Sequence, residues 1–270
     1  MKNLFFNILV LSIVSYIALI LYFYTYQLKI MYTPIIDKPV PVDWGAENPQ
    51  IIKVRTKDNI LLEGWFYPPH LDNKVVVYFH GNGQHIGSTF VGVNQLLDDG
   101  YGLLMVEYRG YAGHDGKVSE SGLYKDARAF LNWLHIDQDI KYENMIFFGE
   151  SMGSALAIQM ANEHKAHALI LFAAFSSIVD VAKFNYPYLP VSFIVKDKYL
   201  NSTKIANVNN IPVLIVHGTM DDIADVSLAR MLFVAAKEPK YYIELEKGTH
   251  MNLYELGAIK TVRGFLKKIN

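Results

Sequence analysis

The strongest indication of architecture in this chain comes from residues 145–160, which read MIFFGESMGSALAIQM. The dense apolar run 145–148 is typical of a buried parallel strand. The pentapeptide GESMG (149–153) follows it and leads into the helical pattern 152–163. A sharp strand-to-helix turn crowds the backbone two positions before and after its apex, and glycine occupies both positions. The stretch therefore predicts a strand, a tight turn and a helix, with Ser151 at the apex.

The rest of the chain alternates between strand and helix patterns. Short apolar or alternating segments typical of strands lie at residues 51–55, 60–67, 75–79, 103–106, 145–148, 168–172, 213–216 and 241–245. Helical patterns lie at residues 89–98, 122–134, 152–163, 226–236 and 252–268. This alternation predicts an α/β fold, with a mostly parallel, doubly wound sheet and helices on both faces. Functional side chains of such a sheet gather at the carboxyl ends of its strands.

A serine at this kind of turn is either a nucleophile or a simple helix cap. A nucleophilic Ser151 needs a neighbouring base, because a serine hydroxyl is a poor nucleophile near neutral pH. The chain order expected after such a turn is serine, acid, histidine. His250 follows the predicted strand 241–245, so we expect it to be the base.

The acid should follow the strand before that one. Residues 213–216 run into HGTMD, which ends at Asp221. This spacing favours Asp221 as the acid, while Asp222 and Asp225 lie close enough to be alternatives that otherwise serve as surface charge or as a helix cap. His217 is expected to orient the loop of the acid.

The negative charge that develops on a substrate oxygen needs two preorganised donors. We expect one to be the backbone N–H of Met152, which follows the nucleophile at a helix N-terminus. The other should come from the loop after strand 75–79, where the N–H of Asn82 is the first candidate and that of Gly83 the next.

Composition also argues against several other classes of protein. The chain has 270 residues, of which 51% are apolar and 19% charged, and its formal net charge is −1. This composition argues against long disordered tracts and against nucleic acid as a partner. There is no cysteine, and the spacing of His80, His85 and His114 fits no metal-ligand pattern. We therefore expect no metal site.

The first thirty residues predict a membrane anchor. Residues 4–24 are almost wholly apolar, and as a helix they span roughly 31 Å, close to the thickness of a bilayer core. A cleaved signal peptide is the alternative, but its apolar region should be shorter and precede a small-residue cleavage site. The positive charges on the two flanks of this segment hardly differ, so they do not determine its orientation. Anchors of this kind more commonly have a short N-terminal tail and a translocated domain, which favours a domain on the non-cytoplasmic side. Residues 31–50 contain several prolines and read as an extended tether or as a segment packed on the domain.

The chain resembles the α/β-hydrolase superfamily and, within it, the membrane-anchored abhydrolase-domain-containing protein 13-like group. The resemblance covers roughly residues 51–269 and the anchor. Besides the GESMG turn, the stretches that carry it are YFHGN (78–82), YRGY (108–111), SESGLYKD (119–126) and HGTMD (217–221). Two positions depart from the usual pattern: Glu107 stands in place of aspartate, and Asp225 in place of proline.

The resemblance implies the α/β-hydrolase fold and a cofactor-free serine hydrolase acting on carboxylic esters or thioesters. With the anchor and tether expected above, the chain divides into an anchor (1–30), a tether (31–50) and a hydrolase domain (51–270), in which the resemblance implies a small lid at 183–207. The aromatic residues of that lid suggest an acyl or lipid-like substrate, unless they pack on the core. A serine peptidase of the same fold and a non-catalytic, membrane-tethered binding protein are the alternative functions.

Overall fold

The computed structural model describes residues 2–70 and 73–269. Within them, eight strands form one sheet in the order β1-β2-β4-β3-β5-β6-β7-β8. β2 is antiparallel to both of its neighbours, and all later pairs in this order are parallel. The strands are β1 Gln50–Arg55, β2 Leu61–Tyr67, β3 Val75–Phe79, β4 Gly102–Val106, β5 Met145–Glu150, β6 Ala168–Phe172, β7 Val213–Gly218 and β8 Lys240–Leu245. Every predicted strand is present, and the predicted mostly parallel α/β sheet is confirmed.

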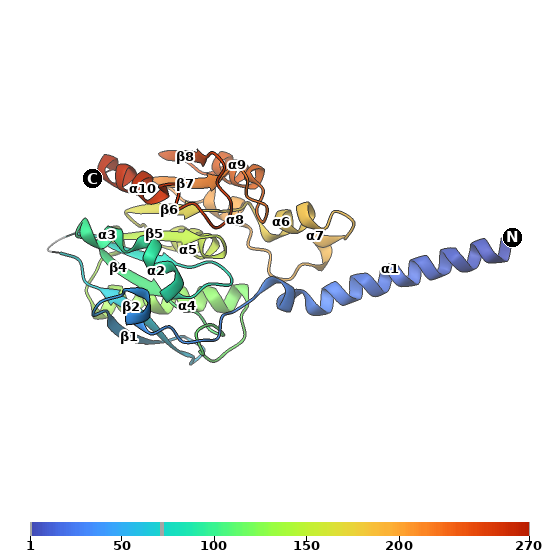
Figure 1. Ribbon diagram of the computed structural model, residues 1–270, viewed down its shortest axis with the longest axis horizontal. Helices are drawn as coiled ribbons and strands as arrows, with labels where there is room; N and C mark the ends of the chain where they lie inside the picture. Colours follow the sequence, from blue (N-terminus) through green and yellow to red (C-terminus); the bar gives the residue numbers. More distant parts are fainter. Residues whose placement is uncertain (1, 71–72, 270) are drawn as a thin grey trace.

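Helices pack on both faces of this sheet, and α6 and α7 project beyond one end of it, toward α1, Lys2–Met31 (Figure 1). The helices after α1 are α2 Ile86–Val93, α3 Gln95–Asp98, α4 Glu120–Asn132, α5 Met152–Glu163, α6 Ile178–Asn185, α7 Val191–Ile194, α8 Asn201–Ile205, α9 Val226–Ala235 and α10 Ala258–Ile269. Short 3-10 helices at Pro41–Trp44 and Tyr142–Asn144 and a π-helical turn at Trp133–Asp137 complete the connections.

Strand β3 illustrates how the sheet divides the core in two. Its residues Val75, Val77 and Phe79 belong to one buried cluster, together with residues of α4, α5 and α9. The intervening Val76 and Tyr78 belong to a second cluster, with residues of α2, α3 and α10. Successive side chains of a strand point to opposite faces, so a wholly apolar strand needs helices on both sides.

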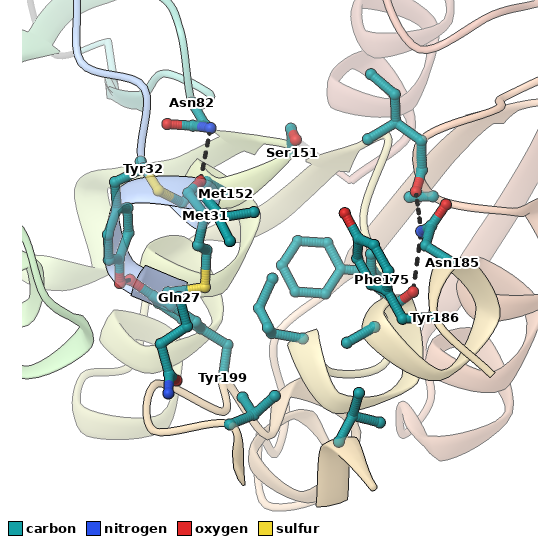
Figure 2. A pocket seen from close by; sticks show the side chains of 18 of the residues that line it. Gln27, Met31, Tyr32, Asn82, Ser151, Met152, Phe175, Asn185, Tyr186 and Tyr199 are labelled. Atoms are coloured by element: carbon teal, nitrogen blue, oxygen red, sulfur yellow. Dashed lines mark hydrogen bonds between the residues drawn. The ribbon is translucent and has the colours of Figure 1, made fainter. Parts of the chain in front are cut away.

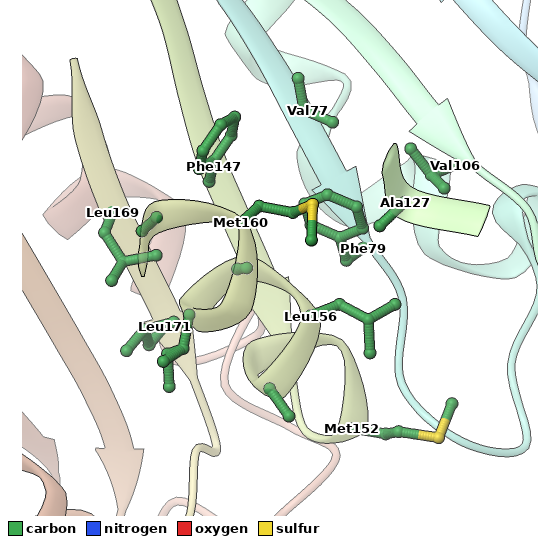
Figure 3. Packing of buried hydrophobic residues seen from close by; sticks show 14 of the residues in the cluster. Val77, Phe79, Val106, Ala127, Phe147, Met152, Leu156, Met160, Leu169 and Leu171 are labelled. Carbon is green, nitrogen blue, oxygen red and sulfur yellow. The ribbon is translucent and has the colours of Figure 1, made fainter. Parts of the chain in front are cut away.

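Helix α5 follows β5 and is buried along nearly its whole length. Figure 3 shows Leu156 and Met160 among side chains of the neighbouring strands. Full burial of a side chain of this size contributes about 1.5–3 kcal/mol. This packing holds the first turn of α5, and therefore the turn before it, in one position.

Two predicted helices differ from the structure. The predicted helix 89–98 is two helices, α2 and α3. The predicted helix 252–268 begins only at Ala258, because Gly257 has a φ of +83° and cannot belong to an α-helix.

Helix α1, Lys2–Met31, extends away from the sheet (Figure 1). Its thirty residues correspond to a length of roughly 45 Å. Residues 2–19 are all exposed, and Ile20, Phe23 and Gln27 are partly covered by the rest of the chain. By length and composition α1 is a candidate membrane span.

The segment after α1 lies against the domain. Its Trp44 packs edge-on against His85, with ring centroids 5.1 Å apart. A Cβ atom at Gly87 would lie only 2.6 Å from the Trp44 ring, so the glycine leaves the space that this side chain fills. The backbone carbonyl of Ile35 also accepts a hydrogen bond from the amide of Ala112.

Candidate active site

Ser151 lies at the apex of the turn between β5 and α5, in the strand–turn–helix context that the sequence predicted. Its φ of 51° and ψ of −117° are unusual for a residue with a side chain. A Cβ at Gly149 would collide with the carbonyl of Gly153, and a Cβ at Gly153 would collide with the carbonyl of Phe79. Both positions therefore require glycine, and the tight turn leaves the Ser151 hydroxyl accessible.

The structure brings Ser151, His250 and Asp221 into one hydrogen-bonded chain. The Nε2 atom of His250 lies 2.8 Å from the Oγ of Ser151, and its Nδ1 lies 2.8 Å from the Oδ2 of Asp221. An ionised carboxylate only accepts hydrogen bonds, so Nδ1 carries the proton and Nε2 faces the hydroxyl as an acceptor. Three loops that follow β5, β7 and β8 supply these residues, at the carboxyl ends of the strands.

The Asp221 carboxylate is held ionised by the groups around it. Burial would raise its pKa, but hydrogen bonds from His217, His250 and the amide of Ala224 outweigh that effect and lower the pKa below its usual range. The Oδ1 atom accepts from the amides of Ile223 and Ala224, at 3.0 and 2.8 Å. Asp221 therefore stays charged at any pH near neutrality.

His217 and the other two carboxylates occupy different environments. The Nε2 of His217 lies 3.2 Å from Asp221 Oδ2 and 2.8 Å from the carbonyl oxygen of Ala224, so the ring braces the loop of the acid. Asp222 is exposed. Asp225 is the N-cap of α9, where its carboxylate accepts from the amide of Ser227, as the helix-cap alternative predicted.

The two residues expected to supply the oxyanion donors, Met152 and Asn82, line the same cavity as Ser151. Met152 is the first residue of α5, where backbone amides have no partner within the helix. Gly81 lies close to Ser151, since a Cβ built on it would be 3.2 Å from the Ser151 Cβ. The loop that contains Asn82 therefore borders the space in front of the serine.

The side chain of Asn82 has a contact that the sequence did not predict. Its amide nitrogen donates to the carbonyl of Met31 at 2.9 Å, and its oxygen accepts from the amide of Thr33 and the hydroxyl of Tyr111. Figure 2 shows the bond between Asn82 and Met31 next to Ser151. This residue thus joins the end of α1 to the loop beside the serine.

A buried network around Glu150 was also missed. Its carboxylate accepts from the hydroxyls of Tyr78 and Tyr254, at 2.6 and 2.9 Å, and from the side chain of Gln84 at 3.0 Å. Gln84 in turn accepts from the amide of Gly81 at 2.7 Å. Burial, followed by the charge of Glu150, raises the pKa of both tyrosines, which therefore stay neutral donors. No motif marks Gln84, because its role comes from linking the nearby Gly81 to Glu150, which is far away in the sequence.

Glu107, the first departure from the family pattern, pairs with His80. Its Oε1 lies 2.7 Å from the Nε2 of His80, and its Oε2 accepts from the amide of Ile86. Both side chains are fully buried. Their role is to support the loop after β3.

A cavity of about 470 Å³ lies in front of Ser151. One wall is the carboxyl-terminal part of α1. Another is the cap segment, which we define as residues 183–207; it contains the end of α6 and the whole of α7 and α8. The lining residues from these two walls are mainly apolar and include Phe23, Ile30, Met31, Tyr186, Leu189 and Val191. Figure 2 shows Met31 and Tyr186 on two sides of this space, with Ser151 at its edge.

Over residues 2–70 and 73–269, no group of three or more His, Asp or Glu side chains is placed to hold a metal ion.

Comparison with known proteins assigns the class. A family model described as serine aminopeptidase, S33, matches residues 72–196. An uncharacterised protein of Mycobacterium tuberculosis, Rv2307c, is 33% identical over 243 residues, which cover 87% of this chain and 84% of the relative. The alpha/beta hydrolase domain-containing protein WAV2 of Arabidopsis thaliana is 28% identical over 285 residues, covering 95% and 91% of the two chains. The Pyrococcus furiosus esterase Pf2001 shares the fold, with a TM-score of 0.70 at 18% identity over 88% of this chain and 99% of that one.

This chain belongs to the α/β-hydrolase superfamily. The predicted α/β-hydrolase fold is confirmed, with α1 as a long apolar helix and candidate anchor. The narrower likeness to the abhydrolase-domain-containing protein 13-like group stays a prediction.

Proposed function

We propose that this protein is a membrane-anchored serine hydrolase that cleaves carboxylic ester or thioester bonds of acyl substrates. The observation that carries the proposal is the chain of 2.8 Å contacts from Ser151 through His250 to Asp221. Residues 1–30 serve as the anchor and residues 51–270 as the hydrolase domain, with the cap segment as a small lid. Residue 1 of this anchor and residues 71–72 and 270 of this domain lie outside the described residues.

Acylation follows from the placement of these groups. The Oγ of Ser151 attacks the carbonyl carbon while its proton passes to Nε2 of His250. The resulting imidazolium is stabilised by the charged Asp221 carboxylate, and the amides of Met152 and Asn82 donate to the oxyanion. Collapse of the tetrahedral intermediate breaks the bond to the leaving alcohol or thiol, which takes the proton from His250 and leaves an acyl group on Ser151.

Deacylation repeats these steps with water. His250 accepts a proton from the attacking water, whose oxygen bonds to the acyl carbon. The same two amides stabilise the second oxyanion. Release of the carboxylic acid returns the proton to the Oγ of Ser151 and restores the starting state, so the cycle requires no metal or cofactor.

The cavity supports an acyl substrate. Its volume of about 470 Å³ lies within the usual range for small-molecule sites. Its walls from α1 and the cap segment are mainly apolar side chains, which favour a hydrocarbon chain over a charged group.

A serine peptidase is the second candidate, because the matching family is described as serine aminopeptidase, S33. An aminopeptidase must bind the positive α-amino group of its substrate, for which a carboxylate is the natural partner. Among the described residues that line the cavity, Asp222 alone has an acidic side chain that is not part of the serine–histidine chain, and it is exposed. This favours esters over peptides.

Labelling with a fluorophosphonate tests the proposal. Wild-type protein in detergent should be labelled covalently and should hydrolyse nitrophenyl esters, whereas Ser151→Ala should do neither while keeping its melting temperature. The buried Ser154, three residues further along, provides the matched control. Labelling that persists in Ser151→Ala but disappears in Ser154→Ala contradicts the assignment. A peptide panel assayed in parallel separates the two candidates.

A further inference from the structure

Three aromatic side chains of the cap segment are exposed, and we call Phe184, Tyr188 and Phe193 the cap tip. Their exposed fractions are 55%, 56% and 90%. None of the three is among the described residues that line the cavity or form the two core clusters. Full burial of such a side chain contributes about 1.5–3 kcal/mol relative to full exposure, and Phe193 forgoes most of that contribution. Neither the core clusters nor the cavity accounts for this exposure, and three such aromatic side chains on one short segment form a candidate apolar contact surface.

The partner of this surface is indicated by the helix that runs beside the cap. The hydroxyl of Tyr16 donates to the carbonyl of Tyr188 at 2.7 Å, and the rings of Phe23 and Tyr186 lie 5.4 Å apart. One turn further on, the side chain of Gln27 exchanges two hydrogen bonds with the backbone of residues 194 and 196. Positions 16, 23 and 27 lie on one face of α1. The cap thus follows α1 over several turns, as Figure 1 shows for α7.

The depth of these contacts along α1 places the cap tip relative to the bilayer. Tyr22, Tyr24 and Tyr26 form a cluster typical of a membrane interface. Tyr16 precedes Tyr24 by eight residues, which corresponds to about 12 Å along a helix axis. The loop at Tyr188 therefore lies on the order of 10 Å inside that interface, less if α1 tilts, and amphipathic elements enter membranes to about 5–10 Å.

Basic side chains lie at the level where phospholipid headgroups would be. Lys29, Lys196 and Lys198 are exposed, and within residues 2–70 and 73–269 none of them forms an ion pair. The Lys196 ammonium lies 4.2 Å from the ring centroid of Tyr24. Lysines and tyrosines beside an apolar surface are typical of a protein region at a membrane interface.

We propose that the cap tip is inserted into the membrane leaflet that the carboxyl-terminal half of α1 crosses, with these three lysines at anionic headgroups. The cavity then has a membrane-facing wall on both sides, from Phe23 and Ile30 of α1 and from Tyr186 of the cap. An acyl chain can pass from the bilayer to Ser151 without crossing water. The substrate class is thus an acyl ester or thioester resident in the membrane; this part rests on the proposed hydrolase activity, whereas insertion of the cap tip does not.

The absence of cysteine from the chain allows a direct test with the full-length protein. Phe193→Cys is labelled with a nitroxide in vesicles of phosphatidylcholine and phosphatidylglycerol. Collisions with oxygen and with a water-soluble nickel complex are then compared. Ile136→Cys is the matched control, because Ile136 is 72% exposed and lies just beyond the end of α4 that is remote from the cap. Ile13→Cys, in the apolar part of α1, provides the reference signal of a label inside the membrane.

The label at position 193 should favour oxygen over nickel, as the label at position 13 does, and the label at position 136 should favour nickel. A label at position 193 that behaves like the one at position 136 overturns the proposal. The activity readout is separate. Phe193→Ser should lower hydrolysis of a long-chain ester in vesicles about tenfold, and hydrolysis of a soluble acetyl ester should not change. Equal loss on both esters overturns the membrane-resident substrate, and inactivity of the wild type on every ester refutes the proposed function while the label still reports insertion.

Discussion

Ser151 has polar, hydrogen-bonded residues on one side and apolar side chains on the other. On the sheet side, His250, Asp221 and Glu150 are buried and each is fixed by hydrogen bonds to other loops. On the side of α1 and the cap segment, the surroundings are apolar side chains such as Phe23 and Tyr186, and much of the surface is exposed. This difference indicates that the chemistry depends on a rigid polar arrangement, whereas the choice of substrate depends on a separate apolar wall.

The largest effect should come from breaking the polar side at its acid. Asp221→Asn removes the charge that stabilises protonated His250 and should lower kcat by roughly 10²- to 10⁴-fold. Asp222→Asn and Asp225→Asn should each stay within about tenfold of wild type, since neither carboxylate contacts the histidine. Esterase assays on the three variants at matched melting temperature check this. A greater loss of kcat in Asp222→Asn than in Asp221→Asn would mean that Asp222, and not Asp221, is the acid that pairs with His250.

Removing part of the apolar side should change selectivity rather than chemistry. Deletion of residues 2–18 leaves the cavity wall intact, whereas deletion of residues 2–30 also removes Phe23, Gln27 and Ile30 from it. Both forms should hydrolyse nitrophenyl acetate, and only the longer deletion should lose about tenfold in kcat/KM for a long-chain ester.

The two deletions are compared in detergent, where membrane attachment does not contribute. Circular dichroism establishes that both are folded. If the longer deletion keeps the full preference for long chains, α1 is an anchor and not a wall of the site.

A smaller loss of kcat is expected from Gln84, which supports the loop beside Ser151 without contacting the serine or the histidine. Gln84→Ala frees the amide of Gly81 and removes one donor to Glu150. The loop beside Ser151 should become less well positioned, and we expect kcat to fall about tenfold with KM little changed. Gln84→Glu retains an acceptor for Gly81 but places a second carboxylate beside Glu150, so its activity separates the two contacts.

The smallest effect should come from the second departure from the family pattern. Asp225→Ala removes the cap of α9 and should lower the free energy of unfolding by about 1 kcal/mol without changing kcat. Denaturant unfolding monitored alongside esterase activity measures both. Asp225→Asn retains a capping side chain and should restore most of the stability.

Much of the molecule could be predicted from local patterns. Buried strands such as β3 and β6 are uninterrupted apolar runs, and their predicted bounds agree with the structure. Helix α10 was placed several residues too early, because an amphipathic pattern does not reveal that Gly257 takes a positive φ. The contacts of Gln84 and Asn82 could not be predicted, because each joins segments separated by many residues, and only the folded chain brings these together.

Local sequence patterns predicted the order of the strands along the chain, the turn around Ser151 and the candidates His250 and Asp221, because each depends on residue types at short spacing, whereas helices α6, α7 and α8 were not predicted. The end of α1 forms a wall of the cavity, held by Asn82 on one side and by Gln27 on the other, and this is evident only in the folded chain. The sequence could not predict this wall, because an apolar helix has the same sequence pattern whether it only anchors a domain or also packs against it. Its role at the site follows from which of its faces the folded cap covers.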